Sequence, residues 1–162
     1  METITLFITG GTLDKVYDET LGRLSFKKTH LTEILEQAKS NLNIELQELM
    51  LVDSLDMNAL QRTEIVTQCK KTIHSKIIIT HGTDTMVATA TELAKENLQK
   101  TIVLTGAMIP YKVTNSDGLF NLGSALAFVQ ILPIGIYIAM NGHYFPWNDV
   151  QKNKSLGKFE NL

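Results

Sequence analysis

The sequence predicts an α/β fold, a single three-layer domain with a mostly parallel sheet and helices on both faces. Short apolar runs rich in β-branched residues, such as residues 77–80, alternate along the chain with segments of helical spacing. That alternation is typical of strand–helix–strand units with parallel strands. The runs are apolar almost throughout, as strands buried on both faces are. The 162 residues, 44% hydrophobic and 20% charged, are enough for one domain with a substantial core.

Five strands and four helices are expected in alternation along the chain. The strands are β-rich or apolar runs at residues 3–9, 44–52, 76–80, 101–105 and 133–140. Apolar residues three and four positions apart predict helices at residues 31–38, 60–69, 86–97 and 119–129. Polar residues that can cap a helix stand at 56–58, and Ser-Asp-Gly at 116–118 precedes the last helix. No internal repeat or linker divides the chain.

Two segments show neither pattern. Residues 13–30 contain many charges, Tyr17 and Gly22, and are predicted to be a long loop. Loops of this length in compact domains are usually functional or else disordered, and we expect this one to be a lid that closes over a ligand. Residues 143–162 are expected to be a polar tail, which holds Trp147.

Charge and composition exclude several classes of partner. The net charge is −2 and the pI about 6.1, with no basic run, so binding to nucleic acid or to an anionic membrane is not expected. No apolar run is long enough to span a bilayer. The first residues run directly into a predicted strand, so no signal peptide is expected. Cys69 is the only cysteine, which excludes an internal disulfide and favours a reducing, cytoplasmic setting.

Glycine or short polar residues follow every predicted strand. Because the carboxyl ends of parallel strands share one edge of a sheet, where ligands bind, these residues should lie together. They are Gly10-Gly11-Thr12, Asp53-Ser54, His81-Gly82-Thr83-Asp84, Gly106-Ala107 and Asn141-Gly142. Helix capping explains one such junction, but hydroxyl and acidic groups recur at several of them. We therefore expect one cleft lined by Thr12, Ser54, Thr83 and Asp84.

Nucleotides and metals fit this edge poorly. The glycines at 10–11 do not belong to a dinucleotide fingerprint, and there is no phosphate-binding loop of the Walker A type. His81 and Asp84 have plausible spacing for a metal, but no third ligand stands out, so no metal is expected. His81 is expected to form hydrogen bonds within its own turn.

Covalent catalysis by threonine fits the edge better. A hydroxyl is a weak nucleophile and needs a base or a cation beside it. The candidates are Lys152 in the tail and Tyr17 in the loop, since either can take a proton in a suitable environment. The alternative for each is an ordinary solvated side chain, and spacing alone favours that alternative.

Six motifs in order resemble the bacterial-type L-asparaginases. Four are Thr-Gly-Gly-Thr-Leu at 9–13, His-Gly-Thr-Asp-Thr-Met at 81–86, Thr-Gly-Ala-Met at 105–108 and Ser-Asp-Gly-Leu-Phe-Asn-Leu at 116–122. The others are Ser-Leu-Asp-Met at 54–57 and Asp-Val-Gln-Lys at 149–152. Most of that family carries a second, C-terminal domain. Residues 1–162 resemble the short-chain form, which consists of the N-terminal domain only.

The resemblance implies hydrolysis of L-asparagine to L-aspartate and ammonia without a cofactor. It implies a nucleophile at Thr12, a proton-handling pair of Thr83 and Lys152, and a catalytic tyrosine at Tyr17. Asp84 acts with that pair and would bind the substrate ammonium group. Backbone amides near Thr83 would form the oxyanion hole, a major source of stabilisation in acyl transfer. The implied substrate contacts are Gly11, Asp53, Ser54, Gly82, Thr83 and Asp84.

Two departures from the family pattern are visible. Leu55 stands where long-chain members usually have a glutamine, and the C-terminal domain that supplies a partner glutamate is absent from residues 1–162. Lys15 or Asp14 are the candidates to orient Tyr17 instead. The family forms homotetramers, so a homo-oligomer, dimer or tetramer, is expected. Glutaminase or other small-amide hydrolysis, and amino-acid binding without turnover, remain alternatives.

Overall fold

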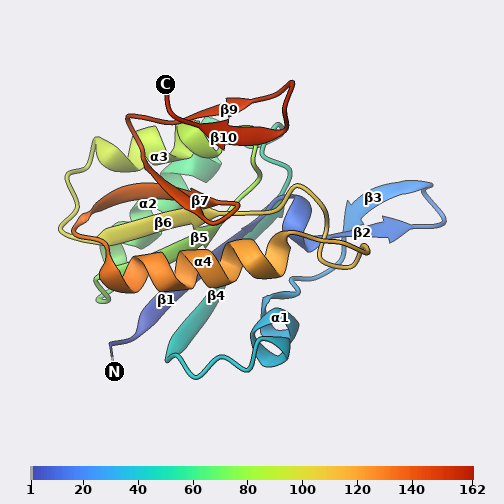
Figure 1. Ribbon diagram of the computed structural model, residues 1–162, viewed down its shortest axis with the longest axis horizontal. Helices are drawn as coiled ribbons and strands as arrows, with labels where there is room; N and C mark the ends of the chain where they lie inside the picture. The colour runs from blue at the N-terminus through green and yellow to red at the C-terminus, as the bar shows by residue number, and fades with distance from the viewer. Residues whose placement is uncertain (1) are drawn as a thin grey trace.

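A six-stranded sheet forms the centre of the computed structural model, which describes residues 2–162 (Figure 1). Its strand order is β4-β1-β5-β6-β7-β8. Neighbouring strands from β4 to β7 are parallel, and only β8 is antiparallel to its neighbour β7. The strands are β1 (Ile4–Gly10), β4 (Ile44–Val52), β5 (Lys76–Thr80), β6 (Thr101–Thr105), β7 (Gly135–Met140) and β8 (His143–Pro146).

Helices cover both faces of this sheet, so the predicted three-layer α/β fold is confirmed (Figure 1). Buried residues of α2 and α3 pack on one face, and those of α1 and α4 on the other. The helices are α1 (Leu31–Gln37), α2 (Ala59–Lys71), α3 (Met86–Ala94) and α4 (Gly118–Ile131). None of the helices described within residues 2–162 is long and apolar enough to cross a membrane.

The central strand β5 contains three consecutive isoleucines, which lie on alternating covered faces of the sheet. Side chains alternate between the two faces of a strand, and Ile77 and Ile79 pack with α2 and α3 while Ile78 packs with α1 and α4. All three isoleucines are fully buried. A parallel strand covered on both faces therefore needs apolar residues at every position.

The prediction of a long loop at residues 13–30 is wrong for most of that range. A short 3-10 helix, η1 (Thr12–Asp14), leads into an antiparallel hairpin of β2 (Lys15–Asp18) and β3 (Arg23–Phe26). The Asp18 carboxylate closes the turn by accepting hydrogen bonds from the backbone amides of Thr20 and Leu21. Gly22 completes it at a φ of 63°. The hairpin extends away from the main sheet (Figure 1).

The predicted polar tail is also structured. Asn141 and Gly142 both have positive φ and join β7 directly to β8 as a two-residue hairpin turn, for which Asn-Gly is the favoured pair. Further on, β9 (Gln151–Asn153) and β10 (Lys158–Glu160) form a second small hairpin. Asn141-Gly142 therefore forms a hairpin turn, and the residues beyond it pack against the same domain.

The buried carboxyl group of Asp14 links η1 to the start of α1. It accepts a hydrogen bond of 2.7 Å from the backbone amide of His30 and one of 3.1 Å from the hydroxyl of Thr29. Burial raises the pKa of Asp14 to about 6, against the opposing effect of these hydrogen bonds. The folded protein therefore holds a proton here that the unfolded chain releases near pH 4.

This shift predicts a specific pH dependence of stability. The contribution of Asp14 is full below about pH 4 and is lost as the pH rises through about 6. Relative to Asp14→Asn, the wild-type free energy of unfolding should fall by up to about 3 kcal/mol between pH 4 and pH 7. Urea unfolding of both proteins across this range measures the difference. A difference that does not vary with pH would contradict the prediction.

Candidate active site at the carboxyl edge of the sheet

Glycines bring the ends of β1, β4 and β5 into direct contact. A Cβ atom on Gly11, whose φ is 78°, would lie 2.5 Å from the backbone nitrogen of Gly82. A Cβ atom on Gly82 would lie 2.5 Å from the Cβ and Oγ of Ser54. Only residues without a side chain allow backbones to approach this closely. The residues that follow the glycines, Thr12 and Thr83, therefore leave from adjoining strand ends.

The next strand, β6, ends against the same edge. A Cβ atom on Gly106 would lie 2.3 Å from the carbonyl oxygen of His81. His81 itself is fully buried and holds the turn after β5. Its Nδ1 lies 2.8 Å from the carbonyl oxygen of Gly82, and its Nε2 lies 2.8 Å from the hydroxyl of Thr89. A carbonyl only accepts, so Nδ1 carries the proton and Nε2 accepts from Thr89.

Burial lowers the pKa of His81 to about 4, so its ring is neutral at physiological pH. Both ring nitrogens are used within the protein. The ring is therefore a structural part of the turn, as the sequence predicted. No group of three or more His, Cys, Asp or Glu side chains within residues 2–162 is arranged to hold a metal ion.

Lys152 reaches this edge from the far end of the chain. Its Nζ donates hydrogen bonds of 2.7 Å to the hydroxyl of Thr83 and 2.8 Å to a carboxylate oxygen of Asp84. The side chain of Lys152 is 11% exposed and Thr83 is 6% exposed. Lysines 154 and 158 of the same hairpin are exposed. The structure thus brings together three of the predicted residues, separated by 68 and 69 positions in sequence.

Buried apolar residues set the position of Lys152. Phe159 lies opposite Lys152 in the register of β9 and β10, and both Phe159 and Val150 are part of the core beneath α2 and α3. The hairpin is therefore anchored on the sheet, and its lysine is turned toward the end of β5. The arrangement places an ammonium group, a hydroxyl and a carboxylate in one hydrogen-bonded chain.

Ser54 is 2% exposed and bound to the loop after β5. Its hydroxyl oxygen accepts a hydrogen bond of 3.3 Å from the amide of Thr85, and its carbonyl accepts one of 2.9 Å from the hydroxyl of Thr85. The guanidinium group of Arg62 donates to that hydroxyl and to the carbonyl of Met57. The proton of the Ser54 hydroxyl stays free to donate to a ligand.

Thr12 begins η1 and is half-buried. Its hydroxyl has no hydrogen-bond partner among residues 2–162. The structure does not bring Tyr17 to it: Tyr17 lies on β2, is 64% exposed and belongs to the hairpin that extends away from the sheet (Figure 1).

Neither residue expected to orient Tyr17 is free to do so. Lys15 forms an ion pair with Asp53, and the carboxyl group of Asp14 is held by Thr29 and His30. Asp53, expected to contact substrate, has its other carboxylate oxygen 3.0 Å from the amide of Leu55.

Sequence reasoning missed the groups that hold the ends of β6 and β7. The Asp117 carboxylate accepts hydrogen bonds of 3.0 Å from the amides of Met108 and Ile109. Asn121 donates to the carbonyl of Gly106 and to Asp117, and accepts from the amide of Asn141. The Ser-Asp-Gly motif at 116–118 was the available signal, but sequence reasoning only placed it before a helix and within a family motif.

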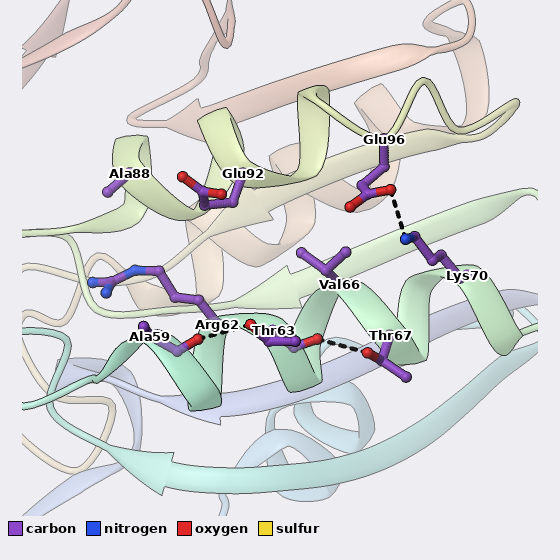
Figure 2. A pocket seen from close by; sticks show the side chains of 9 residues that line it. All are labelled: Ala59, Arg62, Thr63, Val66, Thr67, Lys70, Ala88, Glu92 and Glu96. Atoms are coloured by element: carbon purple, nitrogen blue, oxygen red, sulfur yellow. Dashed lines mark hydrogen bonds and ion pairs between the residues drawn. The ribbon is translucent and has the colours of Figure 1, made fainter.

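A groove of about 400 Å³ lies between α2 and α3, and its lining includes Arg62, which also contacts Thr85 (Figure 2). Val66 lies in the groove, and the ion pair of Lys70 with Glu96, 2.6 Å long, joins α2 to the turn that follows α3 (Figure 2). Its lining mixes methyl groups, hydroxyls and charges of both signs, without a paired nucleophile and base. The chemistry that the residues support is therefore at the sheet edge.

Comparison with known proteins identifies the family of this fold and edge. Residues 3–159 match the family described as Asparaginase, N-terminal. The chain belongs to this family. It is similar to the probable periplasmic L-asparaginase of Haemophilus influenzae, with 31% identity over 169 residues, which cover 96% of this chain and 47% of that protein.

Solved asparaginase structures have the same fold. The thermostable L-asparaginase of Thermococcus kodakarensis superimposes with a TM-score of 0.87 at 29% identity, over 99% of this chain and 51% of that one. A probable cytoplasmic L-asparaginase of Campylobacter jejuni gives 0.82 at 26% identity, over 99% and 52%. The chain thus spans about half the length of the relatives that it matches.

The glycine contacts predict a sharp difference between two substitutions. Gly106→Ala places a methyl group on the backbone of His81 and should lower the free energy of unfolding by at least about 2 kcal/mol. The matched control is Gly123→Ala in α4, where a Cβ atom meets nothing within 4 Å. This variant should raise the free energy of unfolding by about 0.5–1 kcal/mol. Urea unfolding measures both. Similar stability of the two variants would contradict the tight edge.

Proposed function

We propose that the chain is an L-asparagine amidohydrolase, which hydrolyses L-asparagine to L-aspartate and ammonia through a threonine nucleophile and an acyl-enzyme. The observation that carries the proposal is the hydrogen-bonded chain of Lys152, Thr83 and Asp84 beside the strand end that bears Thr12. A binding module needs a carboxylate for an amino group. It does not need two threonines and a buried lysine.

Substrate would be held at both of its charged ends. Oδ2 of Asp84, the carboxylate oxygen that does not contact Lys152, accepts a hydrogen bond from the substrate ammonium group. The free proton of the Ser54 hydroxyl and the backbone around Gly82 and Gly11 receive the α-carboxylate. These groups come from three adjoining strand ends, so the side-chain amide is directed toward Thr12. Rigid positioning of this kind lowers the entropic part of the barrier.

The reaction proceeds in two acyl-transfer steps. The Thr12 oxygen attacks the carbonyl carbon of the substrate amide, and backbone amides near Thr83 stabilise the oxyanion. The C–N bond then breaks, and the proton from Thr12 leaves with ammonia. Water attacks the acyl-enzyme, releases L-aspartate and returns a proton to Thr12. The pair of Thr83 and Lys152 transfers these protons, and Tyr17 joins Thr12 when the β2–β3 hairpin closes as a lid.

The remaining parts of the proposal concern the assembly and the setting. We propose that residues 1–162 act as an asparaginase N-terminal-type domain without a cofactor. We also propose a homo-oligomer, dimer or tetramer, in a cytoplasmic setting. Cysteine usage supports the setting, since Cys69 is buried and free.

Removing either threonine hydroxyl should abolish turnover. Thr12→Ala and Thr83→Ala are each expected to lower kcat by at least about a thousandfold, because groups that act as a unit fail together. Ammonia release from L-asparagine, compared with L-glutamine, measures this loss, and circular dichroism checks the fold. The control is Thr63→Ala, whose exposed hydroxyl only contacts the carbonyl of Ala59 in α2. Near-wild-type ammonia release from both variants would refute the threonine mechanism.

The three lysines of the C-terminal hairpin should behave differently. Lys152→Met is expected to lower kcat by at least about a hundredfold while L-aspartate still binds, because Asp84 and Ser54 retain the ligand. Lys154→Met and Lys158→Met should match the wild type, since both side chains are exposed. Steady-state kinetics with calorimetric titration of L-aspartate compares them. Equal, mild effects at all three positions would remove Lys152 from the mechanism.

A further inference from the structure

One side-chain contact joins the β2–β3 hairpin to the rest of the described chain, beside the backbone hydrogen bond from the amide of Lys15 to the carbonyl of Thr12. The Lys15 ammonium group forms an ion pair with the Asp53 carboxylate. Every other side-chain hydrogen bond of residues 15–26 within the described chain stays inside the hairpin, as those of Asp18 do. Lys15 also lies 5.6 Å from the centre of the Phe26 ring, its neighbour across the hairpin. The root of the hairpin is therefore fixed to the residue that follows β4.

Asp53 directly precedes Ser54 in the chain and carries a negative charge. Burial favours its neutral form, but the hydrogen bonds from Lys15 and from the amide of Leu55 outweigh burial, so the pKa of Asp53 is lowered. The carboxylate is thus ionised at neutral pH, in a side chain that is 28% exposed. Arg23 and Asp56 line the same gap beneath the hairpin, and their opposite charges offset each other. Lys15 is the cation in contact with Asp53.

An α-carboxylate that approaches Ser54 meets this charge. Two carboxylates a few ångströms apart repel each other, and partial burial strengthens the repulsion relative to bulk water. With Lys15 in place, the pair with Asp53 is neutral overall and the repulsion is cancelled. Loss of Lys15 alone would leave the Asp53 charge uncompensated one residue from the serine.

We infer that Lys15 is a positioning residue for substrate, whose ion pair with Asp53 neutralises the entrance to the α-carboxylate subsite at Ser54. The inference rests on the proposed function, because it takes an amino acid as the ligand. Asp53 is then the counter-ion of Lys15. Its expected direct contact with substrate is replaced by this charge balance.

Four proteins separate charge balance from simple tethering of the hairpin. Lys15→Met should raise the KM for L-asparagine and the Kd for L-aspartate about tenfold, with kcat changed less than about twofold. The double variant Lys15→Met/Asp53→Asn should return both constants to within about threefold of wild type. Asp53→Asn alone should lower them, because the Lys15 cation is then free to attract the carboxylate. If Lys15 only tethered the hairpin, the double variant would have KM and Kd values as high as those of Lys15→Met, since both variants lack the Lys15–Asp53 ion pair.

A ligand without an α-carboxylate and a distant ion pair supply the controls. L-Aspartic acid α-amide lacks the α-carboxylate, so its Kd should differ less than about twofold between wild type and Lys15→Met. Lys70→Met breaks the ion pair of α2 with Glu96 in the turn after α3 (Figure 2) and should leave KM and Kd unchanged.

The titrations also separate this inference from the proposed function. A wild type that binds L-aspartate but releases no ammonia from L-asparagine would refute the proposed hydrolysis. The order of the Kd values would still decide the role of Lys15. A wild type that binds neither amino acid would overturn both. A double variant whose KM and Kd stay as high as those of Lys15→Met would overturn the role of Lys15 alone. So would a Lys15→Met variant that loses as much affinity for the α-amide as for L-aspartate.

Discussion

The site depends on close packing of backbone at the carboxyl edge of the sheet. Gly11, Gly82 and Gly106 each lie where a methyl group would meet neighbouring atoms at 2.3–2.5 Å. Without side chains there, the ends of β1, β4, β5 and β6 approach one another within van der Waals distance. That approach determines where the hydroxyls of Thr12, Ser54 and Thr83 stand. Rigidity of this kind suits a site whose groups must hold their positions during a reaction.

Two hairpins complete this rigid edge in different ways. The β9–β10 hairpin is anchored by buried Phe159, so Lys152 stays in contact with Thr83 and Asp84. The β2–β3 hairpin carries exposed Tyr17 and is joined to the sheet by one ion pair. A segment with few buried apolar contacts opens at low free energy cost. The proposed proton transfer requires Lys152 to stay in place, whereas the proposed lid requires the β2–β3 hairpin to move.

Local patterns predicted the main strands and helices because their apolar residues follow clear periods. The β2–β3 hairpin escaped prediction since its strands have four residues each, with charges interspersed, although Asp18 and Gly22 are ordinary turn residues. The Asn-Gly pair at 141–142 was a direct hairpin signal, but the preceding pattern of strand ends led to a different interpretation. Short strands bury too little for hydrophobic period alone to reveal them.

The sequence by itself determined the α/β fold, the order of the strands along the chain and the identity of the groups that follow them. It also contained the motifs that indicate the asparaginase family. Only the tertiary structure decided which of those groups meet: Lys152 with Thr83 and Asp84, Lys15 with Asp53, and Tyr17 with none of them. Hydrophobic periods report burial along one element. Contacts between residues some 70 positions apart depend on how elements pack, which no local pattern encodes.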